Sequence, residues 1–150
     1  DGDRFTYVDP AAPESAAIME ANPWLGEPHR DRAAVFADLD LDGDVDVVVV
    51  ELNGPLRLLE NRHDRTDDWV IVRPVPAAGA EVVLRTGDVV QRRWIRGGGP
   101  FQSTTSPEAH FGIDAASTDP LVVEIRWPDG TFRTVEVEPG TRTTVERSEA

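Results

Sequence analysis

Five aspartates occupy alternate positions of the stretch 38–46, and a glycine stands at its sixth position. Carboxylates about 4 Å apart repel by roughly 4 kcal/mol per pair at an effective dielectric of about 20, so a folded loop that gathers them calls for a cation. Hard cations such as Ca²⁺ take six to eight oxygen ligands, whereas Mg²⁺ keeps its waters and fits less well. The pattern predicts a calcium site. The expected ligands are the carboxylates of Asp38, Asp40, Asp42 and Asp46 and the backbone carbonyl of Asp44.

The segments that flank this stretch predict strands rather than the helices of an EF-hand. The twelfth position of the loop is Val49, where an EF-hand places a bidentate Glu. Four consecutive valines occupy residues 47–50, and β-branched residues favour extended backbone. Gly43 permits the sharp turn within the loop. We therefore expect a strand, a metal loop and a second strand, with a solvated acidic turn that holds no metal as the alternative.

The composition excludes several classes of function. The 150 residues carry a net charge of −13, which argues against binding to nucleic acid or to anionic membrane surfaces, since both attract clustered Lys and Arg. The chain has no Cys and no Lys, so disulfides, thiol nucleophiles and Schiff bases are excluded. No apolar run approaches the roughly 20 residues of a membrane-spanning helix. The Lys-free composition suggests a bacterial gene, and the start on Asp1 suggests a C-terminal fragment or a processed product.

The N-terminal module, residues 1–62, is expected to hold the metal loop and a few short elements. A strand over residues 5–8 precedes a short helix over 15–21, which Ser15 would cap. The Asn-Gly pair at 53–54 predicts a hairpin turn between two strands.

Two other groups of polar residues are candidate metal ligands with simpler explanations beside them. His29 is either a ligand or an exposed loop residue. His63, Asp64 and Asp68 form either a second metal group or a solvated connector, and charge runs are usually solvated. We place the module boundary in this connector, so that a second domain covers residues 69–146.

From residue 69 onward, short segments are separated by Gly, Pro, Asp and Asn, which is typical of a β-sandwich or barrel. Residues 97–100 predict a bend, with an anion cradle as the weaker alternative. The expected strands are 69–73, 81–85, 89–96, 109–112, 121–127, 131–137 and 141–146. The fold class is therefore all-β, with one propeller-like calcium-binding hairpin unit and a small antiparallel β-sandwich or barrel.

Two parts of the chain resemble known modules. Residues 35–49 resemble the FG-GAP or VCBS repeat, which implies a propeller blade with calcium in the loop of its hairpin. Residues 96–99 (RGGG), 110–113 (HFGI) and 123–130 (VEIRWPDG) resemble the ASPIC/UnbV domain. This family includes extracellular cartilage acidic proteins and UnbV proteins encoded beside enediyne polyketide synthases, and the Lys-free composition fits the second group better. The segment 74–80 is shorter than the family pattern.

These observations favour a non-catalytic, calcium-binding interaction or scaffold module of a larger repeat protein, since no nucleophile motif occurs. Its partner would be a protein, a small molecule or a removed N-terminal part of the same chain. The alternative is an accessory enzyme or product-binding protein of enediyne biosynthesis, with chemistry near Trp94, Arg96 and His110, although a lone His is more often structural. A third interpretation is adhesion to glycans through exposed Trp side chains. Adhesion implies an extracellular location and biosynthesis a cytoplasmic one.

Overall fold

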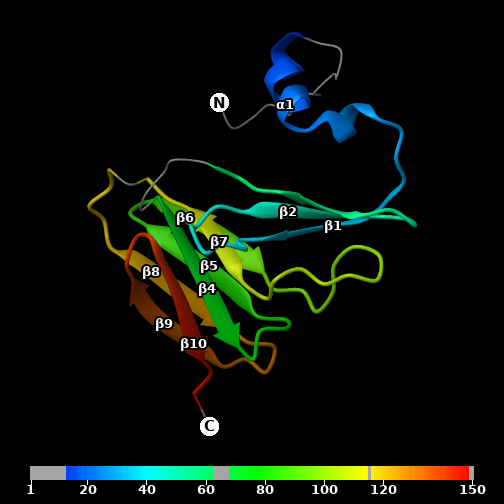
Figure 1. Ribbon diagram of the computed structural model, residues 1–150. Coiled ribbons are helices and arrows are strands. Elements are labelled where there is room, and N and C mark those ends of the chain that lie inside the picture. Colours follow the sequence, from blue (N-terminus) through cyan, green and yellow to red (C-terminus); the bar gives the residue numbers. More distant parts are fainter. Residues whose placement is uncertain (1–12, 63–67, 115, 149–150) are drawn as a thin grey trace. The chain divides into compact units, whose positions relative to one another are not determined.

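The computed structural model describes residues 13–62, 68–114 and 116–148 (Figure 1). The expected strand over 5–8, as well as His63 and Asp64, lies outside these ranges. The chain divides into two compact units, Asp1–Asp31 and Arg32–Ala150. The boundary expected between residues 62 and 69 stays a prediction.

The elements are mostly strands, which confirms the all-β prediction. In chain order they are η1 (Pro13–Ser15), α1 (Ala16–Ala21), η2 (Pro23–Gly26), β1 (Asp31–Ala37), β2 (Asp46–Glu51), β3 (Leu56–Leu59), β4 (Trp69–Val75), β5 (Glu81–Thr86), β6 (Val89–Trp94), β7 (Ala109–Gly112), β8 (Leu121–Arg126), β9 (Phe132–Val137) and β10 (Thr141–Glu146).

The first unit contains the short helix expected near residue 15. Ser15 occupies the N-cap position of α1, as predicted, but its side chain makes no capping hydrogen bond. Asn22 ends the helix, and its backbone N–H donates to the carbonyl of Ile18. Pro23 then starts η2, because Pro cannot continue the hydrogen bonding of α1.

Two sheets of the second unit share one hydrophobic core. One has the strand order β10-β4-β7 and the other β6-β5-β8-β9. Most buried residues of both sheets form a single cluster, so the two layers pack face to face as a sandwich. On β8, Leu121, Val123 and Ile125 point into this core while the residues between them are more exposed, as their alternation predicts.

One pairing differs from the antiparallel arrangement expected for this domain. Strand β10 runs parallel to β4, with Arg142 opposite Ile71, while β7 pairs with β4 in the antiparallel sense. Val70 and Val72 of β4 point into the core, and Ile71 is buried outside that core cluster. Both faces of β4 are therefore covered.

The third sheet has the order β1-β2-β3 and carries the acidic loop (Figure 1). The loop joins β1 to β2, as expected from the valines that follow it. Strands β2 and β3 pair antiparallel with Val50 opposite Leu56, so the Asn-Gly pair at 53–54 lies in the predicted turn.

Candidate metal centre

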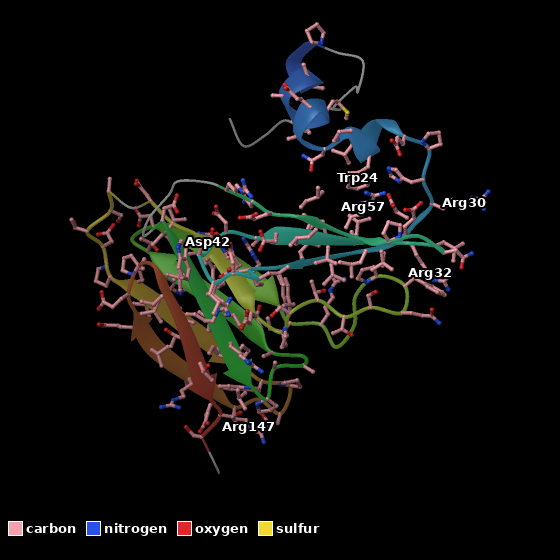
Figure 2. All side chains as sticks on the ribbon, in the orientation of Figure 1. Trp24, Arg30, Arg32, Asp42, Arg57 and Arg147 are labelled. Atoms are coloured by element: carbon pink, nitrogen blue, oxygen red, sulfur yellow. The ribbon has the colours of Figure 1, made fainter. Side chains whose placement is uncertain are left out.

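Three of the five predicted ligands lie together in the loop between β1 and β2. Carboxylate oxygens of Asp38, Asp40 and Asp42 are all within 4.8 Å of one another. Among the described residues, the side chains of Asp44 and Asp46 do not belong to this group. Figure 2 shows Asp42 near the end of β1 that leads into the loop, with Arg32 at the opposite end of the strand.

The loop is folded by its own aspartates, which accept hydrogen bonds from its backbone. Asp38 accepts from the N–H of Leu41 at 2.8 Å and of Gly43 at 3.3 Å. Asp42 accepts from the N–H of Asp44 at 2.9 Å. These bonds hold the turn in one conformation and direct its backbone amides toward the acids.

Asp46 ties the two ends of the loop to the chain beyond β3. Its two carboxylate oxygens accept from the N–H groups of Leu39 and Asn61, each at 2.9 Å. Asp46 is 2% exposed, so these bonds offset the cost of burying its charge. A carboxylate has about four lone-pair sites, and these contacts leave Asp46 acceptor capacity.

The acids differ in their exposure and therefore in their electrostatics. Asp38 is buried, whereas Asp40 and Asp42 are exposed and Asp44 is half-buried. Partial desolvation raises the pKa of the Asp40 carboxyl, and the neighbouring charge of Asp42 raises this pKa further. The crowding of like charges is thus unfavourable in the absence of a counterion.

Gly43 is required both by its backbone conformation and by what lies against it. Its φ is +98°, a conformation that L-residues rarely adopt. A methyl group at this position would overlap the indole ring of Trp69. Gly43 therefore permits the turn, as expected, and it also allows the loop to approach β4 closely, which the sequence did not indicate.

A row of three residues across the sheet β10-β4-β7 lies beneath the loop, and we call it the cross-strand row. Arg142, Ile71 and His110 are direct neighbours on adjacent strands. The Arg142 guanidinium donates to Asp38 Oδ2 at 3.0 Å, and His110 Nε2 donates to the carbonyl of Gly43 at 2.7 Å. The loop is therefore held to the sheet at both ends of this row.

Arg142 is the functional residue that the sequence did not reveal. Besides Asp38 it lies 3.6 Å from the Glu108 carboxylate, so one guanidinium serves two acids. The side chain of Asp38 is only 3% exposed, and this ion pair compensates its burial. The alternation along β10 could have predicted that Arg142 lies on the outer face of the strand. It could not have predicted the contact with Asp38, which lies 104 positions earlier in the sequence.

The candidate residues Trp94, Arg96 and His110 line one cleft of about 650 Å³ beside the loop. Asp38 and Val45 also line it. Their proximity does not by itself form a catalytic arrangement. His110 Nε2 contacts the backbone carbonyl of Gly43 rather than an acid or a nucleophile.

His29 and Asp68 are not part of the loop's acid group. His29 is half-buried rather than exposed. Its ring lies 4.9 Å from that of Trp24, and its Nδ1 lies 2.9 Å from the carboxylate of Asp31. His29 thus has structural contacts within the first unit.

The donor set of the loop suits a hard cation. It consists of carboxylate oxygen atoms, without sulfur or imidazole, which is the chemistry that Ca²⁺ prefers. The bonds that fold the loop use only part of the lone-pair capacity of Asp38, Asp40 and Asp42. These residues therefore fit such an ion.

Comparison with known proteins agrees with the ASPIC/UnbV resemblance of the second half. The family described as ASPIC and UnbV matches residues 73–150. Cartilage acidic protein 1 of Mus musculus is 33% identical over 126 residues, which cover 75% of this chain and 19% of that protein. Cartilage acidic protein 1 of Homo sapiens is 32% identical over 136 residues, which cover 82% of this chain and 20% of that protein. The chain spans about a fifth of the length of these relatives, and with the family matching more than half of its residues, it belongs to the ASPIC and UnbV family.

Proposed function

We propose that the loop 38–46 holds a calcium ion and that the chain serves as a non-catalytic interaction or scaffold module. The observation that carries this proposal is the group of three carboxylates within 4.8 Å, folded by bonds from the loop's own backbone. Asp38, Asp40, Asp42 and Asp46 would supply carboxylate oxygens and Asp44 its carbonyl. An ion there would neutralise the acids and stabilise the loop against the cross-strand row.

We further infer that β1, the loop and β2 form a unit of the FG-GAP or VCBS type. The sequence 35–49 and the strand-loop-strand arrangement support this inference. Such a unit would pack beside similar repeats, so the partner would be another part of a longer chain or a separate protein. No helix in the described ranges is long and apolar enough to cross a membrane.

Calcium titration of the melting temperature tests the proposal. Calcium at a hundredfold excess over Kd should stabilise the protein by about 2.7 kcal/mol, and EDTA should remove this gain. Asp42→Ala should abolish the response, whereas Asp129→Ala, which changes an acid in a turn outside the loop, should keep it. A melting temperature that is the same in calcium and in EDTA would rule the proposal out.

A second candidate is a product-binding or accessory role in enediyne biosynthesis. It is favoured by the cleft that brings Trp94, Arg96 and His110 together and by membership of a family whose name includes UnbV. A producing strain that carries His110→Gln, with the protein still folded, should lose or change its product. An unaltered product profile would exclude a chemical role for His110.

A further inference from the structure

The cleft beside the loop has an apolar floor and two aromatic walls. Its volume, about 650 Å³, is within the range of sites that hold small molecules. Ile71 and Ile95 are almost fully buried and form part of its floor. Phe36 on β1 and Trp94 at the end of β6 also line it, and each is more than half exposed, at 51% and 59%.

Exposure of two large aromatic side chains at one cleft favours an apolar ligand. Aromatic rings bury 150–250 Å² when covered, and stacking contributes about 0.5–1.5 kcal/mol beyond that area. Ile71 and Ile95 of the lining are buried and Val45 is half-buried, so Phe36 and Trp94 offer the most exposed apolar surface on which a flat body could lie.

The lining carries charges of both signs, and Arg96 is the group in it that can bind an anion. Asp38 and Glu108 also line the cleft, and both are in contact with the single guanidinium of Arg142, which offsets part of their charge. Arg96 also lines the cleft and is exposed. Across residues 13–62, 68–114 and 116–148, Arg96 has no hydrogen-bond or ion-pair partner. Its guanidinium is therefore free to bind a carboxylate in the bidentate manner that Arg favours.

The segment after β6 completes the cleft and is attached to β1. The guanidinium of Arg32 donates to the Gln102 side chain at 3.2 Å and lies 4.4 Å from the ring centroid of Phe101. Gly99 packs against residues 103–105 so closely that a side chain would press on their backbone. These contacts give the glycine-rich bend a fixed shape, and Gly98 and Gly99 contribute to the lining.

We propose that this cleft is a binding site for a flat, apolar monocarboxylate, with the apolar body between Phe36 and Trp94 and the carboxylate on Arg96. The floor, the aromatic side chains and Arg96 belong to the protein itself, so the cleft can bind such a ligand without calcium, although the affinity can differ because Asp38 and Val45 of the loop also line it.

Binding of 2-naphthoate to the 150-residue chain tests the proposal, with 2-naphthamide as the uncharged isostere. Calorimetry should give a dissociation constant of about 1 mM or tighter for the acid, which is the expectation for a ligand of this size. The amide should bind about tenfold more weakly, since it lacks the charge. Amide-resolved NMR should locate the shifts at the residues that line the cleft. Measurements in calcium and in EDTA separate this proposal from the calcium proposal.

Matched variants identify the groups that act. Arg96→Gln should weaken 2-naphthoate about tenfold without affecting the amide, and Arg96→Lys should recover part of the loss. Arg85→Gln, at an exposed position of β5, is the charge control and should bind as the parent does. Trp94→Ala should weaken both ligands about fivefold, whereas Phe132→Ala, another exposed aromatic, should weaken neither.

Three affinity results would overturn the proposal. They are equal affinity for acid and amide, unchanged affinity in a folded Arg96→Gln variant, and the absence of binding by either ligand at millimolar concentration. Shifts confined to residues away from the cleft would also overturn it, because they would show an adventitious contact only.

Discussion

At the scale of single residues, Gly43 links the conformation of the loop to its contact with the sheet. We expect Gly43→Ala to destabilise the protein by at least about 1 kcal/mol, because it strains the backbone at φ +98° and forces the Trp69 ring to move. Urea denaturation would measure this. Gly98→Ala is the matched control, since nothing lies within 4 Å of that site and its change should be within about 0.5 kcal/mol. Equal effects of the two substitutions would contradict the assignment.

Asp129 offers a pH-dependent prediction away from the loop. A hydrogen bond from the Thr131 hydroxyl, followed by one from the Thr131 backbone N–H, lowers the pKa of the Asp129 carboxyl. The stability that its charged form contributes is present above the ordinary Asp pKa of about 3.9 and is lost as the pH falls through the lower folded-state value. An NMR titration of the carboxyl carbon should therefore have its midpoint below about 3.9, and Thr131→Val should raise it. A midpoint at or above the ordinary value would contradict this cause.

At the scale of elements, the cross-strand row makes the loop and the sandwich interdependent. We expect Arg142→Gln to destabilise the protein by about 1–3 kcal/mol in EDTA, because it removes the ion pair of a buried carboxylate. The loss should be smaller in saturating calcium, since the proposed ion would also neutralise Asp38. Thermal denaturation in the two buffers measures the difference.

Arg73→Gln is the control for this experiment, since Arg73 is an exposed arginine on β4. Its effect should be within about 0.5 kcal/mol in both buffers. If Arg142→Gln were equally costly with and without calcium, the ion and the guanidinium would not share Asp38.

The sequence predicted the elements better than their assembly. The alternation along β8 and the valines after the loop correctly indicated strands and buried faces, because these signals are local. The parallel pairing of β10 with β4, the partners of Arg142 and the contact of Arg32 with Gln102 could not be predicted. Alternation shows which face a side chain occupies, but it does not show which strand comes to lie beside it.

The same reasoning separates the parts of the candidate sites. The acids at 38, 40 and 42 could be grouped from spacing alone, because one short loop contains them. The cleft draws its lining from β1, β4, β7 and the segment after β6, so its shape depends on long-range packing. The sequence likewise did not reveal that Trp94 is exposed whereas Trp127 is buried, with only 3% of it exposed.

At the scale of the whole second unit, the loop is also a wall of the cleft, since Asp38 and Val45 line it. If both proposals hold, calcium and an apolar carboxylate should favour the same conformation. We expect 2-naphthoate to bind at least about fivefold more weakly in EDTA than in calcium. Saturating 2-naphthoate should increase the affinity for calcium by the same factor. Calorimetry in both orders measures this, and Asp42→Ala should remove the dependence. Identical affinities in the two buffers would show that the sites are independent.

The contact between Asp38 and Arg142 spans 104 residues of chain. At a translation rate of about 5–20 residues per second, a ribosome makes Arg142 roughly 5 to 20 s after Asp38. Throughout that interval the nascent loop lacks the guanidinium of Arg142, and dissolved cations serve as its counterions. The concentration of such ions around the emerging polypeptide would then influence how early this turn forms during biosynthesis.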